Sequence, residues 1–130
     1  MYRFVEHTGE VEIAIAAPTE AGVFEEALMA VGEFIRHEPE GELLRRAVDL
    51  SAGDRASLLV EWLSEFVFLA EVESFVPERV AAFELVDERL RATVEGRLGR
   101  PSHLVKAVTL NSIEVRQEDG TWHGRVVLDV

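Results

Sequence analysis

The chain has 130 residues, enough to bury a hydrophobic core without disulfides, and this length predicts a single domain over residues 1–130. Hydrophobic residues make up 48% of the sequence and charged residues 29%, a balance typical of globular rather than disordered chains. The net charge of −12 disfavours a protein that binds nucleic acid by neutralising phosphates, and the absence of cysteine excludes disulfides, thiolate metal sites and cysteine nucleophiles.

Charged residues interrupt every apolar stretch well before the ~20 residues that a membrane-spanning helix needs. The N-terminal segment also lacks the basic region, apolar core and small-residue cleavage site of a secretory signal. We therefore expect a cytoplasmic protein with no membrane partner and no direct binding to nucleic acid. The sequence does not indicate an oligomeric state.

The N-terminal part of the chain predicts strands and one helix. Residues 11–17 alternate between apolar and polar or small side chains, which predicts a half-buried strand, and a possible short strand at residues 2–6 precedes it. Thr19 is a good N-cap for a helix that ends near Ile35, and residues 37–41 (HEPEG) predict a loop.

The middle of the chain predicts a strand over residues 43–50 and a second helix over residues 55–73, with Asp54 as its N-cap. The apolar face of this helix is unusually wide, which indicates a central position in the fold. Its apolar residues are Leu58, Leu59, Trp62, Leu63, Phe66, Val67, Leu69 and Ala70.

The C-terminal half predicts four strands. Two flank an Asp87-Glu88 turn, and residues 105–117 and 121–129 form a hairpin through Glu118-Asp119-Gly120. In the second strand of the first pair, alternate residues face inward and outward. The inward set is Leu90, Ala92, Val94, Gly96 and Leu98, and the outward set is Arg89, Arg91, Thr93, Glu95 and Arg97.

This order of elements predicts an α+β fold. Most strands have one apolar face, so we expect a two-layer sandwich in which both helices pack on one face of a mixed or mostly antiparallel sheet. The other face of the sheet is then open to solvent or available for a functional site.

Common catalytic motifs are absent from the sequence. It contains no glycine-rich phosphate loop, and no serine lies in the context of a nucleophile elbow. The four histidines are scattered and form no paired zinc-binding motif. These absences argue against a conventional hydrolase or zinc enzyme.

Oxygen ligands instead occur near both ends of the chain. Glu10 precedes the strand at residues 11–17 and Asp129 is the penultimate residue, and alternation places both carboxylates opposite the apolar faces. Val130 adds a terminal carboxylate and a carbonyl oxygen. If the first and last strands are neighbours, these oxygens converge as calcium or magnesium requires, and the alternative is a pair of solvated strand-end acids.

Two further residues stand out near these acids. Lys106 is the only lysine among thirteen basic residues, which indicates either a need for a compact ammonium group or chance codon use. His7 precedes the Thr-Gly turn before Glu10 and could act as a ligand or a proton shuttle near neutral pH, with a structural turn histidine as the alternative.

Four segments, taken in order, resemble the archease family. They are FVEHTGEVEIAI near the N-terminus, LLVEWLSEFVFL at residues 58–69, KAVT at residues 106–109, and an EVR…DG-W…V-DV ending over residues 114–130. Two departures from the family pattern occur: Gly9-Glu10 stands where Ala-Asp is typical, and Leu110-Asn111 stands where Tyr-His is common.

The resemblance implies an accessory protein rather than an enzyme. Archeases promote guanylylation of the active-site histidine of RtcB-type tRNA-splicing ligases and allow these ligases multiple turnovers. The resemblance also implies a calcium site formed by Glu10, Asp129 and a main-chain oxygen of Val130, with a functional lysine at Lys106. The longer Glu10 side chain sets its carboxylate about one methylene, ~1.5 Å, further from the backbone, and calcium tolerates such variation.

Two other functions remain open from the residues alone. One is a metal-dependent hydrolase or nucleotide-acting enzyme that uses the same acids together with His7. The other is a chaperone-like interaction module whose acidic surface holds basic client proteins without a metal.

The composition also predicts heat tolerance. The chain has one asparagine, one glutamine and no cysteine, so residue types that degrade on heating are scarce. We expect scanning calorimetry to give a melting temperature above the roughly 45–65 °C of domains from mesophiles. A midpoint within that range would contradict this prediction.

Overall fold

The structure is a computed structural model that describes residues 1–36 and 41–130; residues 37–40, which belong to the predicted HEPEG loop, lie outside the described residues. Within the described residues the chain forms two helices and seven strands. In chain order these are β1 (Tyr2–His7), β2 (Glu10–Ala17), α1 (Glu20–Ile35), β3 (Leu43–Ser51), α2 (Arg55–Glu73), β4 (Phe75–Val86), β5 (Arg89–Leu98), β6 (Ala107–Glu118) and β7 (Thr121–Asp129).

Both helices begin at the predicted capping residues. The Thr19 hydroxyl accepts a hydrogen bond from the backbone N–H of Gly22 at 3.0 Å. The Asp54 carboxylate accepts one from the N–H of Ser57 at 2.7 Å. Each cap satisfies a backbone N–H that the first helical turn would otherwise leave unpaired. This is why the N-termini of both helices could be predicted correctly from the sequence.

The strands divide between two antiparallel sheets, whereas the sequence predicts a single sheet. One sheet has the order β1-β2-β7-β6 and the other the order β3-β5-β4. Every strand pair in the described residues is antiparallel, so the α+β class and the antiparallel character are confirmed. Alternation identifies the buried face of each strand, but it does not specify which strands hydrogen-bond to each other.

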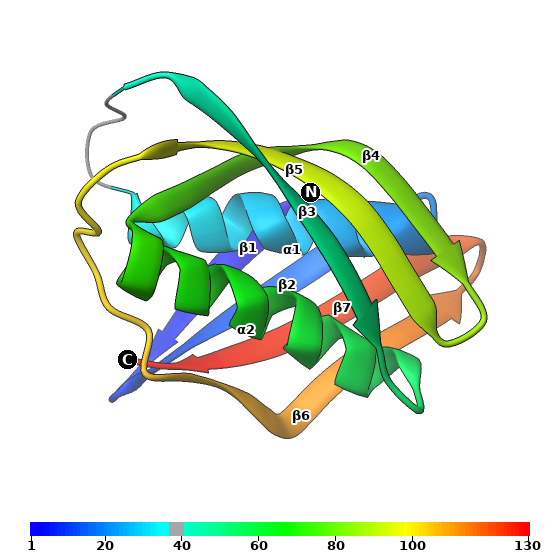
Figure 1. The fold of residues 1–130 in the computed structure, drawn as a ribbon. Coiled ribbons are helices and arrows are strands. Elements are labelled where there is room, and N and C mark those ends of the chain that lie inside the picture. The colour runs from blue at the N-terminus through cyan, green and yellow to red at the C-terminus, as the bar shows by residue number, and fades with distance from the viewer. Residues whose placement is uncertain (37–40) are drawn as a thin grey trace.

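The two helices lie between the two sheets and are shared by them (Figure 1). Helix α1 contacts β4 of one sheet and β1, β2 and β7 of the other, and α2 contacts β6 as well as β3 and β4. Helix α2 therefore has protein on more than one side, which accounts for its wide apolar face. Within this part of the chain no helix has the length and apolar character needed to cross a membrane.

Aromatic side chains fill the core between the helices and the three-stranded sheet. Trp62 of α2 is fully buried, and its indole N–H donates a hydrogen bond to the carbonyl oxygen of Phe24 in α1 at 2.9 Å. Its ring packs edge-on against Phe66 at a centroid distance of 4.7 Å and against Phe83 of β4 at 5.8 Å. The buried indole thus has its polar atom satisfied while its ring joins the two helices to β4.

Glu95 of β5 faces outward as predicted, yet it is only 4% exposed. Its neighbours across the sheet cover it: Arg45 of β3 and Arg79 of β4 lie directly opposite, with Nε atoms 3.1 and 2.5 Å from its carboxylate oxygens. The predicted inward Leu98 is 44% exposed, because it is the last residue of β5. Burial in this strand therefore depends on its neighbours as well as on alternation.

The ion pairs of Glu95 with Arg45 and Arg79 predict that the stability of the protein depends on pH. The hydrogen bond from Arg79, together with the one from Arg45, outweighs burial and holds the pKa of Glu95 below its ordinary value of 4.5. A carboxyl whose pKa is lowered on folding stabilises the protein above its unfolded-state pKa, and this contribution is lost as the pH falls through the folded-state pKa. We expect Glu95→Gln to lower the melting temperature at pH 7, by a difference that shrinks below pH 4.5.

Thermal melts of both proteins between pH 7 and pH 3 test this expectation. Glu84→Gln is the matched control, because Glu84 lies on the same sheet but is exposed. A Glu95→Gln deficit that stays constant over this range, or one that Glu84→Gln reproduces, would contradict the assignment.

Candidate functional site

The residues singled out near the two ends of the chain meet at one end of the four-stranded sheet. Glu10 of β2 lies directly opposite Asp129 of β7, and His7 of β1 lies directly opposite Glu10. Ala107, the first residue of β6, lies opposite Asp129 on the other side. We call His7, Glu10, Lys106, Asp129 and Val130 the strand-end site.

The side chains of His7, Glu10 and Asp129 belong to one face of this sheet. Residues directly opposite each other in an antiparallel pair share a face, with Cβ atoms about 4.5–5.5 Å apart. The neighbouring residues Val11 and Leu128 are buried on the helix side, whereas Glu10 is exposed and Asp129 half-buried. The two carboxylates therefore lie side by side on the face that points away from the helices.

Backbone hydrogen bonds hold the chain ends at this position. The N–H of Val130 donates to the carbonyl oxygen of Gly9 at 3.1 Å, and the N–H of Lys106 donates to the carbonyl oxygen of Asp129 at 2.7 Å. Gly9 has φ +74°, a conformation that favours glycine, which explains the Thr8-Gly9 turn between β1 and β2. The structure thus brings all five predicted site residues to one edge of the molecule.

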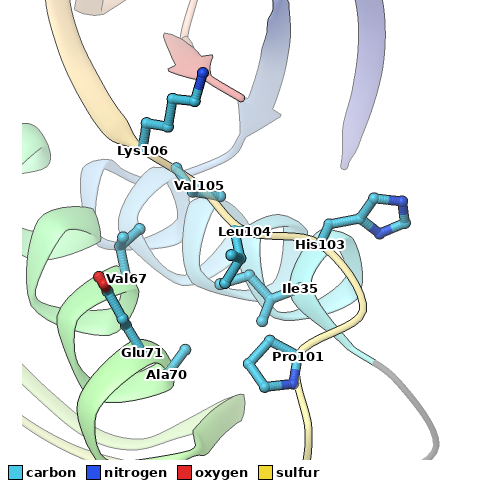
Figure 2. Close-up of a pocket in the computed structure, with 9 residues that line it drawn as sticks. All are labelled: Ile35, Val67, Ala70, Glu71, Pro101, His103, Leu104, Val105 and Lys106. Atoms are coloured by element: carbon cyan, nitrogen blue, oxygen red, sulfur yellow. The ribbon is translucent and has the colours of Figure 1, made fainter.

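Lys106 lies where the segment after β5 enters β6. Figure 2 shows its side chain extending toward the end of β7 and away from the other labelled residues. The backbone bond to Asp129 fixes the position of its Cα, while the ammonium group remains exposed. This places a compact positive charge at the same end of the sheet as the two carboxylates, although Lys106 forms no ion pair with either of them among the described residues.

The carboxylates of the strand-end site carry uncompensated charge. Among the described residues no ion pair joins Glu10 or Asp129 to a basic group, whereas Glu12, two residues along β2, pairs with Arg125 at 2.5 Å. Like charges directly opposite each other on a sheet are destabilising. The site therefore favours the approach of a cation.

The donor chemistry of the site fits calcium better than a transition metal. Glu10 and Asp129 offer carboxylate oxygens and Val130 offers a main-chain oxygen, which are the ligands that calcium prefers. Calcium takes about 6–8 oxygen ligands, so water or a partner protein would have to complete the shell. Over residues 1–36 and 41–130 no three His, Asp or Glu side chains form a group that could hold a metal ion by themselves.

A serine that the sequence did not indicate anchors the segment leading to Lys106. The Ser102 N–H donates to the carbonyl oxygen of Ile35 at 2.9 Å, and its hydroxyl donates to that of Arg36 at 2.7 Å. These carbonyls end helix α1 and have no partner in the helix itself. The residues around Ser102 do not indicate this role, because its partners Ile35 and Arg36 lie far away in the sequence.

Known proteins resemble this sequence over nearly its whole length. The sequence model of the Archease protein family (MTH1598/TM1083) matches residues 2–130. This chain belongs to the archease family. The match confirms the resemblance that the four sequence segments indicate.

Family members of known sequence align over nearly their full length. Protein archease of Methanosarcina mazei is 34% identical, over 99% of this chain and 95% of its own. Protein archease of Methanopyrus kandleri is 30% identical, over 97% of this chain and 96% of its own.

Solved archease structures have the same fold. The solution structure of Methanobacterium thermoautotrophicum protein 1598 gives a TM-score of 0.76 at 28% identity, over 99% of this chain and 98% of that one. The crystal structure of a Thermotoga maritima archease, described as a possible chaperone, gives 0.73 at 15% identity, over 100% of this chain and 98% of that one. At that identity the second likeness concerns the fold alone.

Proposed function

We propose that the protein is an accessory protein that promotes guanylylation and multiple turnover of an RtcB-type tRNA-splicing ligase, and that it has no catalytic activity of its own. Membership of the archease family supports an accessory role. The observation that carries the proposal is the strand-end site, where Glu10 lies opposite Asp129 and the backbone of Lys106 bonds to Asp129. A cytoplasmic location remains part of this proposal.

An accessory protein of this kind acts by binding one state of the ligase more tightly than another. The carboxylates of Glu10 and Asp129, with the main-chain oxygen of Val130, are the groups that would hold calcium. Calcium held there would offset the charge of the two carboxylates and leave positions open for further oxygen ligands. Lys106 contributes an exposed ammonium that can donate hydrogen bonds to carboxylate or phosphate oxygens of the ligase complex.

His7 occupies the outer position of the same row, opposite Glu10 on the edge strand β1. We assign it a contact with the ligase rather than with calcium, because calcium prefers oxygen to imidazole nitrogen. Its exposure at the edge of the sheet is consistent with such a contact.

The activation prediction concerns three exposed or half-exposed residues. With an active RtcB-type ligase and GTP, the wild-type protein should raise both the amount of guanylylated ligase and the number of turnovers. Glu10→Ala, Asp129→Ala and Lys106→Ala should each reduce this stimulation about tenfold or more, because each removes a charged contact. Glu88→Ala, which removes an exposed acid in the β4–β5 turn, should retain full stimulation.

All four variants should keep the wild-type circular dichroism spectrum, since none of these side chains belongs to the core. An active ligase whose guanylylation and turnover are unchanged by the wild-type protein would overturn the proposed function. Lys106→Arg separates charge from shape: its failure to stimulate would show that a compact ammonium is needed.

The calcium prediction has a readout that does not involve the ligase. Calorimetric titration of the isolated protein with calcium should detect binding that Glu10→Ala and Asp129→Ala abolish, whereas Lys106→Ala should bind calcium and still fail to stimulate the ligase. Absence of calcium binding by the wild-type protein would overturn the calcium assignment and favour a metal-free interaction module. Hydrolysis of phosphoesters by the isolated protein with magnesium, manganese or calcium would favour the enzyme alternative.

A further inference from the structure

A surface groove lies next to the strand-end site, between α2, the end of α1 and the segment of residues 101–106 (Figure 2). Its volume is about 250 Å³. Six of the lining residues are apolar: Ile35, Val67, Ala70, Pro101, Leu104 and Val105. Glu71 and Lys106 add one charge of each sign at its margin.

The apolar surface continues outside this groove. Leu104 is 69% exposed although it lines the groove, and Phe68 and Val72 of α2 are 53% and 62% exposed. Phe68 and Val72 each follow a groove-lining residue of α2, at about 100° around the helix. Leu104 at the groove, with Phe68 and Val72 on the neighbouring outward face of α2, forms more than the single, scattered residues of an ordinary surface.

The charges around this surface are mostly negative. Glu61, Glu65 and Glu71 lie on the same outward side of α2 as Phe68 and Val72, by helical spacing. Among the described residues none of these three glutamates forms an ion pair. A second copy of this chain, with a net charge of −12, would be repelled, whereas a basic partner would be attracted.

We propose that the groove, with Leu104, Phe68 and Val72, is a docking surface for a segment of the ligase that presents apolar side chains flanked by lysine or arginine. This inference rests on the proposed function. Lys106 belongs both to the groove margin and to the strand-end site, so one bound partner can reach both. The docking surface supplies affinity for the ligase, and the strand-end site supplies the preference for one ligase state.

The test uses charge substitutions with a matched control. Val72→Glu and Leu104→Glu place a charge on the docking surface, and Val86→Glu places the same charge on a valine that is 54% exposed at the end of β4. Calorimetry should show that the first two variants bind the ligase at least tenfold more weakly than the wild-type protein, while Val86→Glu binds normally. Saturating amounts of Val72→Glu should still stimulate guanylylation fully, because its strand-end site is intact.

The outcomes distinguish a failure of this inference from a failure of the proposed function. A wild-type protein that stimulates the ligase, with all three variants binding equally well, overturns the docking surface and leaves the proposed function standing. A wild-type protein that neither binds nor stimulates the ligase overturns both. Analytical ultracentrifugation that shows a dimer disrupted by Val72→Glu would assign the surface to a second copy and overturn the inference. Val72→Ser replaces Val72→Glu if the charged variant does not fold.

Discussion

The antiparallel pairing of β2 with β7 is the constraint on which the site depends. It joins the first long strand to the last one and sets Glu10 opposite Asp129. A shift of one residue in either strand would turn its carboxylate to the helix side of the sheet. Packing opposes such a shift: a Cβ at Gly124 of β7 would lie 2.6 Å from Cγ1 of Val23, so α1 leaves room for no larger residue there. Core packing thus determines the register that aligns the acids.

Much of the local structure could be predicted because its causes lie within a few residues. The side chains of Thr19 and Asp54 each accept a hydrogen bond from the backbone N–H three residues further along the chain. In the last hairpin Asp119 and Gly120 both have positive φ, as the turn between β6 and β7 requires. The division into two sheets and the burial of Glu95 depend instead on which strands pair. Arg45 and Arg79 come from different strands, and nothing in the sequence around Glu95 specifies them.

The strand-end site could likewise be predicted only in part from the sequence. Alternation along each strand indicates that Glu10 and Asp129 face away from the core. It does not specify that β2 pairs with β7, which is what brings the two acids together. Ser102 and the groove had no sequence signal of their own. Val67 and Ala70 are part of the apolar face of α2, and Ile35 ends the apolar stripe of α1, so each is indistinguishable from a core residue until the segment of residues 101–106 is placed beside them.

That segment also explains why the groove and the strand-end site belong together. Just before it the N–H of Gly99 bonds to the carbonyl oxygen of Ser74 at 2.8 Å, within it Ser102 bonds to the end of α1, and at its end Lys106 bonds to Asp129. Leu104 lies between the last two anchors. The backbone between Ser102 and Lys106 is short and held at both ends, so the same two anchors position both Leu104 and Lys106. A partner that fills the groove would therefore lie against the segment that carries the ammonium group of the strand-end site.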